Sequence, residues 1–194
     1  MYHENNHEGA TPRSVIPMSG TDGKLSTEEK IRDLIAALND PEIDKRHDAV
    51  SALREVGEPA VVHLIAAVAQ AQDNDQRWYA AVALSRIGGP AIVPLIAAMA
   101  VHTSRDFRKY AAAALGEIGV PAIDPLIDGM ATDDRELRGF LSQALCRIGR
   151  PAVEPLTRRL GDENEVLRSC AALTLWQMGE TGLPAMIKQV QDEE

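Results

Sequence analysis

The chain has 194 residues, of which 45% are apolar and only 4% aromatic, and its 20 basic and 29 acidic residues give a net charge of −9. An acidic balance argues against a nucleic-acid groove, for which a basic stripe is expected, and against an anionic membrane surface. No apolar run approaches the roughly 18 residues of a membrane span. The N-terminus lacks the basic-then-apolar layout of a signal peptide, and Cys146 and Cys170 show no metal-ligand spacing. These features predict a cytoplasmic protein with reduced, buried thiols.

Residues 1–27 are polar, contain several glycines and prolines and lack periodicity, which predicts a flexible N-terminal tail. A small apolar island, Val15, Ile16 and Met18, is interpreted as incidental; the alternative is docking onto the protein's own groove or onto a partner. The segment His3–His7 matches H-E-x-x-H, a zinc-protease spacing that requires a helix. Two asparagines separate its histidines and no third ligand follows at a suitable spacing, so we attribute the match to chance.

The first helix is expected to begin at Ser26 or Thr27, because Ser26 and Glu29 stand at the spacing of a capping box. A helical stripe of apolar residues follows at Ile31, Leu34, Ile35 and Leu38. The segment Asn39-Asp40-Pro41 ends this helix, because the residue before a proline disfavours helical backbone. A second helix is predicted over about 43–56.

This two-helix plan recurs along the chain. An arginine returns every 30 or 31 residues, at Arg46, Arg77, Arg108, Arg138 and Arg168. A glycine returns at the same spacing and ends each unit, at Gly57, Gly88, Gly119, Gly149 and Gly179. A fixed period of about 30 residues is the signature of a stacked repeat array. The predicted units are 28–57, 59–88, 90–119, 121–149 and 151–179, followed by an amphipathic end helix over 183–191 that is expected to shield the last repeat.

A Pro-Ala pair opens four of these units, and in three of them a second proline follows four residues later, at Pro94, Pro125 and Pro155. Proline costs about 3 kcal/mol deep inside a helix but little in the first turn, where its missing N–H is not needed. We therefore expect each Pro-Ala pair to form a tight turn, with the helix proper beginning near the second proline. The whole chain should contain about eleven helices.

The shared pattern R-x-x-A-x-x-A-L-x-x-I-G-x-P-A-x-x-P-L-I resembles the HEAT-like repeats of the phycobilisome-lyase type over residues 28–191. The resemblance implies an all-α, right-handed α-α superhelix of about five helix pairs plus a C-terminal capping helix. It implies that the first helix of each pair lies outside and the second lines a concave groove. Proteins with similar repeats include phycobilin lyase subunits, deoxyhypusine hydroxylases, alkylpurine DNA glycosylases and prokaryotic adaptor proteins.

Two enzymatic branches of that family are disfavoured by the residues present. The hydroxylases hold two irons with His-Glu pairs at equivalent positions of several repeats, whereas here only His47-Asp48 comes close to such a pair. One imidazole and one carboxylate cannot hold two irons. The glycosylases need a basic groove for phosphates, which an acidic chain does not predict. The phycobilin-lyase branch has no local catalytic signature to test and stays open.

Positions counted from the repeat arginine sort the side chains of each second helix into faces. Positions +3, +6, +7 and +10 are predicted to form the core; in the third unit they are Ala111, Ala114, Leu115 and Ile118. Position +2 is predicted to form an aromatic stacking column between repeats, with Tyr79, Tyr110 and Phe140. Position +9 alternates in charge and predicts ion pairs between neighbouring repeats, with Glu55, Arg86, Glu117 and Arg147.

Positions +1, +5 and +8 are predicted to point away from the core, and both tryptophans of the chain fall there. Exposed apolar clusters tend to mark binding sites. The residues expected to line a partner-binding groove are Arg54, Trp78, Val82, Lys109, Ala113, Gly116, Gln143, Leu173 and Trp176. Ala113 and Gly116 are small enough to let a partner's backbone approach closely. The alternative is that a neighbouring helix, the tail or a second copy covers this face.

The sequence therefore favours a non-enzymatic, prokaryotic scaffold or adaptor that holds a protein partner in its groove. It contains no residue set that provides a nucleophile with its base, a metal cage or a phosphate cradle, so no catalytic residue, metal or cofactor is expected. The alternative is a subunit of, or helper to, an enzyme such as a phycobilin-lyase-like or protein-modifying complex. No nucleic-acid or membrane partner is expected, and self-association stays open.

Overall fold

A computed structural model describes residues 26–192, which form eleven α-helices with no strand among them. The first helices of five pairs are α1 (Thr27–Ala37), α3 (Val61–Gln70), α5 (Gly89–Val101), α7 (Ile123–Gly129) and α9 (Val153–Arg158). Their second helices are α2 (Ile43–Val56), α4 (Asn74–Ile87), α6 (Arg105–Ile118), α8 (Arg135–Ile148) and α10 (Glu165–Gln177). The end helix is α11 (Leu183–Asp192). The prediction of an all-α solenoid is confirmed, while the predicted tail with its His3–His7 segment lies almost wholly outside the described residues.

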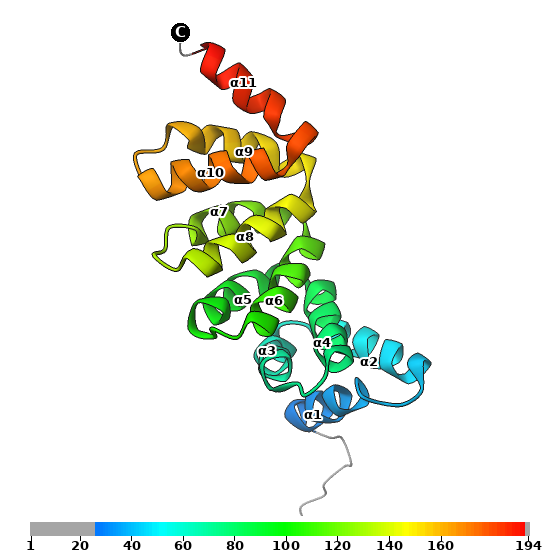
Figure 1. The fold of residues 1–194 in the computed structure, drawn as a ribbon. Helices are drawn as coiled ribbons and strands as arrows, with labels where there is room; N and C mark the ends of the chain where they lie inside the picture. Colours follow the sequence, from blue (N-terminus) through cyan, green and yellow to red (C-terminus); the bar gives the residue numbers. More distant parts are fainter. Residues whose placement is uncertain (1–25, 193–194) are drawn as a thin grey trace, which may run out of the picture.

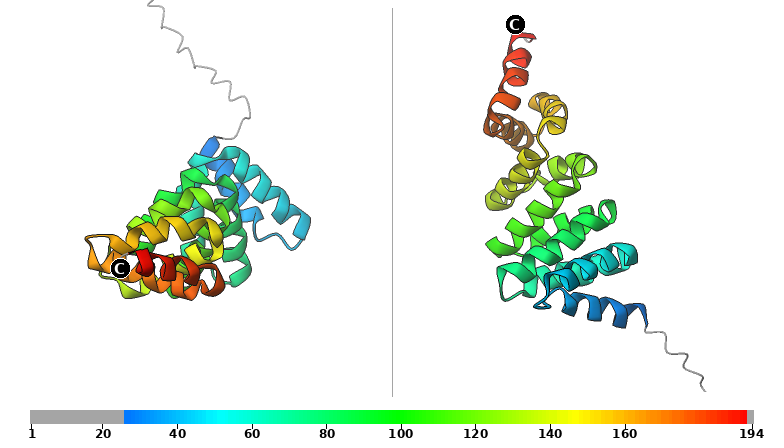
Figure 2. Two further views of the ribbon diagram at one scale, coloured as in Figure 1. Left: turned by 90° about the horizontal axis from the view of Figure 1, so that it is seen from above. Right: turned by 90° about the vertical axis from the view of Figure 1, so that its right-hand side faces the viewer.

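The helix pairs stack along one axis, from α1 and α2 at one end to α9, α10 and α11 at the other (Figure 1). Each second helix packs against the second helix of the next pair, and each first helix against the next first helix. The stack is therefore two helices thick, and its elongated form is seen in the right-hand view of Figure 2. On this arrangement the faces of the second helices that point away from the first helices form one continuous surface.

The core runs along the stack as columns of equivalent residues from successive repeats. The leucines at position +7 are all buried: Leu53, Leu84, Leu115, Leu145 and Leu175. A matching column from the first helices is equally buried: Leu64, Leu95, Leu126 and Leu156. Each such leucine contributes roughly 1.5–3 kcal/mol by removing apolar surface from water. Position +10 differs from the prediction, because its residues lie at the ends of the second helices and are only half-buried against the core, at Val56, Ile87, Ile118, Ile148 and Met178.

Local signals in the sequence set the helix ends. Ser26 and Glu29 form the predicted capping box at the start of α1. Polar side chains also cap the second helices of the later repeats, at Asp73, Ser104, Asp134 and Asn164. The glycines after α2, α4, α6 and α8 have φ between 73° and 80°, a backbone region that other residues rarely adopt. These ends fix the length and register of each second helix.

The Pro-Ala turns differ in one repeat from the prediction. In three repeats a short 3-10 turn precedes the first helix: Glu58–Ala60, Val120–Ala122 and Arg150–Ala152. The helices α7 and α9 then begin two residues before their second prolines. In the third repeat, however, α5 begins at Gly89 and continues through Pro94 without a separate turn. Pro94 lies in the first two turns of that helix.

The repeat arginines connect each second helix to the loop before it. Guanidinium groups donate hydrogen bonds to loop or helix-end carbonyls in four repeats: Arg77 to Ala71, Arg108 to Met99 and His102, Arg138 to Thr132, and Arg168 to Asp162 and Glu163. Arg108 is only 1% exposed and also pairs with Asp134, the N-cap of α8. Its hydrogen bond is the main cause that lowers the pKa of the Asp134 carboxyl below its ordinary value. Arg108 thus joins the third repeat to the fourth.

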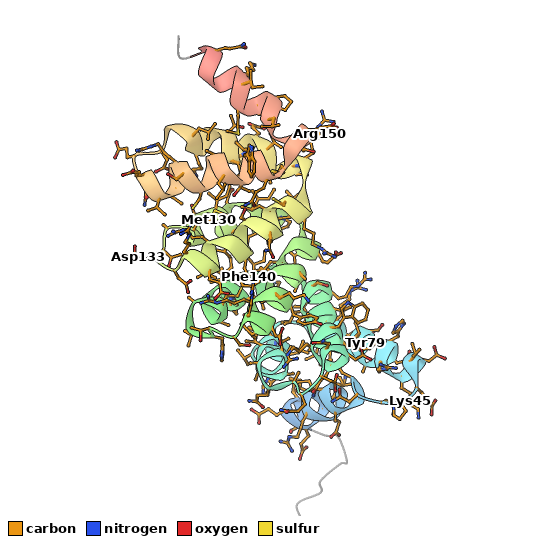
Figure 3. The ribbon with its side chains drawn as sticks, viewed as in Figure 1. Lys45, Tyr79, Met130, Asp133, Phe140 and Arg150 are labelled. Carbon is orange, nitrogen blue, oxygen red and sulfur yellow. The ribbon has the colours of Figure 1, made fainter. Side chains whose placement is uncertain are left out.

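The predicted aromatic column is only partly formed. Tyr79 on α4 and Phe140 on α8, which Figure 3 labels, are buried, and Tyr110 on α6 is half-buried, as residues at the edge of the core should be. Within residues 26–192, however, none of these three rings pairs with another of the three. Tyr79 contacts Trp78 of its own helix, and the Arg46 guanidinium lies over its ring at 4.8 Å. The column therefore packs repeats together without ring stacking.

The end helix shields the last repeat less than predicted. Met186 packs against the core, but Leu183 is exposed and Ile187 is 58% exposed. A hollow of about 490 Å³ separates α9 from α11, lined in part by Val153 and Ala185. The start of α11 is held close to α10, because Gly182 lies in tight contact with the carbonyl of Leu175. From there α11 leads away from the stack (Figure 1).

Cys146 and Cys170 are free thiols, half-buried where full burial was predicted. Their partial burial raises the pKa of both thiols. Among residues 26–192, no helix is both long and apolar enough to cross a membrane. The same part of the chain has no group of three or more His, Cys, Asp or Glu side chains arranged to hold a metal ion.

Candidate functional site

Three hollows lie side by side between successive second helices. The first, of about 290 Å³, lies between α2 and α4 and is lined by His47, Val50, Ser51, Arg54, Trp78, Tyr79, Val82 and Arg86. The central one, of about 380 Å³, lies between α4 and α6 and is lined by Trp78, Ala81, Val82, Ser85, Arg86, Tyr110, Ala113, Ala114, Glu117 and Arg147. The third, of about 240 Å³, lies between α6 and α8 and is lined by Lys109, Ala112, Ala113, Gln143, Ala144 and Arg147.

These hollows share walls and so form one surface, which we call the groove. Trp78, Val82 and Arg86 line both of the first two hollows. Ala113 and Arg147 line both the central and the third hollow. The groove therefore crosses four second helices, α2, α4, α6 and α8. Alanines line the central and the third hollow, where their small side chains leave room between the helices.

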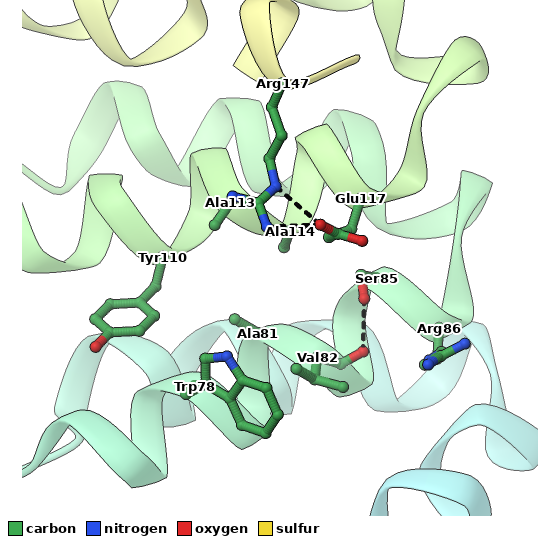
Figure 4. Close-up of a pocket in the computed structure, with 10 residues that line it drawn as sticks. All are labelled: Trp78, Ala81, Val82, Ser85, Arg86, Tyr110, Ala113, Ala114, Glu117 and Arg147. Carbon is green, nitrogen blue, oxygen red and sulfur yellow. Dashed lines mark hydrogen bonds and ion pairs between the residues drawn. The ribbon is translucent and has the colours of Figure 1, made fainter. Parts of the chain in front are cut away.

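Trp78 is the largest side chain at the groove surface and is 48% exposed. Its ring meets the buried Tyr79 ring edge to face, with 4.8 Å between centroids. Such an aromatic pair contributes about 0.5–1.5 kcal/mol beyond its buried area. Trp78 rests against Tyr79 and lines both of the first two hollows, with one side of its indole open to the central hollow (Figure 4).

The opposite wall of the central hollow is closed by an ion pair between repeats. The Arg147 guanidinium on α8 reaches Glu117 on α6 at 2.7 Å (Figure 4). The ion pairs predicted at position +9 are thus formed only in part, because among the described residues Arg86 pairs with neither Glu55 nor Glu117. The stem of Arg147 lies across Gly116, where an added Cβ would come within 2.6 Å of the Arg147 Cδ. Both charged groups are more than half exposed, so the pair contributes only about 0–1 kcal/mol. It shapes the groove more than it stabilises the fold.

The two serine hydroxyl groups in the groove donate hydrogen bonds to backbone carbonyls. The Ser85 Oγ donates a hydrogen bond to the carbonyl of Val82 at 2.8 Å. The Ser51 Oγ donates to the carbonyl of His47 at 3.0 Å, so the imidazole of His47 is not its partner. A serine nucleophile needs a base that accepts its proton, and neither serine donates to one.

The structure brings together six of the predicted site residues in the groove: Arg54, Trp78, Val82, Lys109, Ala113 and Gln143. Gly116 was expected to be open to a partner, and this expectation is wrong. It is buried, because the stem of Arg147 from the next repeat covers it. Leu173 and Trp176 are exposed on α10 as predicted, Trp176 by 63%, but they do not line the three hollows.

Sequence reasoning missed several groove residues at one helical position. Arg86, Glu117 and Arg147 all stand at position +9 and were interpreted only as ion-pair partners. Their alternation in charge along a single column was the available signal that this position faces the surface. Tyr110 was assigned to the core edge, but its half-exposed ring also forms part of the central wall.

Comparison with protein families identifies the repeat. The model of HEAT repeats matches three overlapping spans, residues 31–116, 63–139 and 123–194. The chain belongs to the HEAT-repeat family. A comparison with curated proteins finds no match to this HEAT-repeat protein.

Solved structures similar to this HEAT-repeat protein include two artificial ones. An engineered protein shares 17% sequence identity over 84% of this chain and 86% of that chain, with a TM-score of 0.32. A designed armadillo repeat protein shares 17% identity over 81% of this chain and 91% of that chain, with a TM-score of 0.31. At these scores the stacks superpose only loosely, and the family assignment rests on the sequence match.

Proposed function

We propose that this HEAT-repeat protein is a non-enzymatic scaffold that binds a segment of a protein partner in the groove. The observation that carries the proposal is the continuity of the three hollows around Trp78. Binding energy at protein interfaces concentrates in a few anchors, and tryptophan and arginine are the commonest of them. The groove presents one tryptophan that rests against Tyr79, with small residues on the facing helix and arginines at the rim.

The chemistry of the groove supports binding rather than catalysis. Its serines donate to backbone carbonyls, and its strongest polar contact, between Arg147 and Glu117, joins two side chains of the protein itself. Small residues such as Ala113 leave room for a partner's backbone, which is what recognition of a peptide segment requires.

The finer assignments remain predictions. They are the relationship to the phycobilisome-lyase type within the HEAT-repeat family, a role as helper to an enzyme, a prokaryotic origin and a cytoplasmic location. The proposal of a scaffold needs none of them, because it depends only on the surface of the second helices.

Site-specific photo-cross-linking tests the proposal. A photoreactive residue replaces either Gln143, which is exposed in the groove, or Val93, which is exposed on the first-helix layer. We expect cross-linked protein partners from the native cell extract at position 143 but not at position 93. Adding Trp78→Ala should reduce the yield at position 143 by about tenfold, as for an interface anchor of 1–2 kcal/mol.

Melting temperatures of all variants control for folding. Equal capture at both positions would contradict a specific groove. Capture at position 143 that does not depend on Trp78 would contradict the role of Trp78 as the anchor.

A further inference from the structure

We infer that the groove binds an acidic protein segment that carries an apolar side chain next to its carboxylates, an inference that rests on the proposed function. The charge of the lining residues is the first observation. The groove presents four cationic side chains, Arg54, Arg86, Lys109 and Arg147, and one carboxylate, Glu117. This local excess of positive charge is opposite in sign to the chain's net charge of −9.

Three of the four cations have no carboxylate beside them in the part of the chain that the structure describes. Within residues 26–192, no Asp or Glu oxygen lies within 4.0 Å of the charged nitrogens of Arg54, Arg86 or Lys109. Only Arg147 forms an ion pair, with Glu117. The groove therefore keeps most of its positive charge available to a ligand.

The positions of two of these cations suggest a second role, which the test must separate from binding. Arg54 and Arg86 lie in the last turns of α2 and α4, where a cation interacts favourably with the helix C-terminus. That interaction is worth about 0.3–1 kcal/mol at an exposed site, so it affects stability only slightly. Loss of binding without loss of stability would assign these arginines to the ligand.

The net negative charge of the whole chain does not prevent binding of an acidic segment. Charges interact over about 8 Å at physiological salt, so a segment inside the groove senses the lining residues more than the distant surface. The remote acidic residues slow the approach at low salt but leave the contact energy in the groove unchanged. Glu55, which stands on α2 at the position of Arg86 on α4, does not line the groove.

The dimensions of the groove fit a short extended segment. Four helices packed about 8–10 Å apart span about 30 Å, which an extended chain covers with about nine residues at about 3.3 Å each. Side chains alternate between the two faces of such a segment, so residues four apart point to the same side and lie about 13 Å apart, which the long side chains of cations on neighbouring helices can span. Carboxylates at this spacing could meet cations of successive repeats, while an apolar side chain between them contacts Trp78.

Selection from a random library of nine-residue peptides, displayed on phage and bound to the full chain, tests the inference. We expect enrichment of peptides with Asp or Glu at several positions and an apolar or aromatic residue between them. The Trp78→Ala variant should lose these peptides. Enriched peptides that require Trp78 but lack acidic residues would keep the proposed function and overturn the charge inference. No enrichment over the Trp78→Ala variant would count against both.

Titration of the best peptide against charge-reversed variants gives the second measurement. Arg54→Glu and Arg86→Glu should each weaken binding by about tenfold or more, because they replace attraction by repulsion. Arg158→Glu, at an exposed position on α9 in the first-helix layer, is the matched control and should change affinity less than about twofold. Raising NaCl from about 0.05 M to 0.5 M should weaken the wild-type complex more than the complexes of the charge-reversed variants, because salt also screens the repulsion that the new glutamate introduces.

A single-stranded oligonucleotide in the same titration distinguishes another anionic ligand, because cations beside an aromatic ring also suit nucleic acid. We expect an oligothymidine of matched length to compete poorly with the peptide. Tighter binding of the oligonucleotide, lost in Arg54→Glu and Arg86→Glu, would overturn the assignment to a protein segment. Unchanged peptide affinity in both arginine variants, with unchanged melting temperatures, would overturn the cationic groove.

Discussion

The repeat arginine shows how one residue type connects each second helix to the loop before it. A helix leaves its last carbonyls without intrahelical partners, and the loop after each first helix adds more. The guanidinium carries several donors in a fixed fork, so a single side chain can bond the loop and still reach a neighbouring repeat. Arg108 does both, since it donates to Met99 and His102 and pairs with Asp134 of the next repeat.

The first prediction concerns this buried arginine. Arg108→Ala should lower the free energy of unfolding by about 3 kcal/mol or more, because it leaves buried carbonyls and the Asp134 carboxylate without their donor. Arg105→Ala removes a guanidinium from the same helix at an exposed site and should cost less than about 0.5 kcal/mol. Urea denaturation followed by circular dichroism measures both, and similar losses for the two variants would show that Arg108 is not a structural connection.

At the scale of elements, glycine has opposite roles at the end and in the middle of the second helices. Gly119 follows α6 with φ 80° and ψ −137°, a conformation that is costly for any residue with a Cβ. Gly139 lies inside α8, where glycine only weakens the helix and where an added Cβ would meet no atom within 4 Å. Glycine therefore favours the end of α6 at Gly119 but destabilises the interior of α8 at Gly139.

The second prediction uses these two glycines as a matched pair. Gly119→Ala should destabilise the protein by about 1–3 kcal/mol through backbone strain. Gly139→Ala should stabilise it by about 0.5–1 kcal/mol, because alanine is the better helix former. Differential scanning calorimetry should show melting temperatures that move in opposite directions. A decrease for both variants would mean that α8 needs glycine for a contact with another molecule or a neighbouring repeat.

At the scale of the whole molecule, stability is distributed along one axis. Each repeat contacts its neighbours, so the array behaves as a row of units joined by interfaces. Leu115 is buried in the middle repeat and α11 packs only on the last one. A destabilising substitution in one repeat should therefore affect mainly that repeat and its neighbours. The position of the substituted repeat along the stack should determine which repeats unfold locally.

The third prediction follows from this one-dimensional arrangement. Leu115→Ala should cost about 2–5 kcal/mol and reduce amide protection in the repeats on both sides of α6. Removing residues 183–194 should reduce protection mainly in α9 and α10. Hydrogen exchange with mass spectrometry compares the two variants. A uniform loss across the chain in both would indicate a single cooperative core in place of coupled repeats.

Several features of the site could be predicted because they depend on helical periodicity. Counting from the repeat arginine correctly placed the buried leucines and the surface positions of Trp78, Lys109 and Gln143. The same count placed Gly116 at the surface, which is wrong, because the side chain that covers it comes from the next repeat. Periodicity describes one helix in isolation and contains no information on how far a neighbour's side chain reaches.

The sequence by itself determined the repeat, its period, the two-helix unit and the helix ends, since each depends on residues close together in the chain. The tertiary structure decided which side chains share a surface. Four cationic side chains from four different helices line one groove: Arg54, Arg86, Lys109 and Arg147. The chain's net charge of −9 gives no indication of this local positive charge. The close approach of Gly182, before α11, to the Leu175 carbonyl was likewise visible only in the structure. Local backbone preferences depend on each residue and its near neighbours in the sequence, whereas the distances between helices follow from how their side chains pack together.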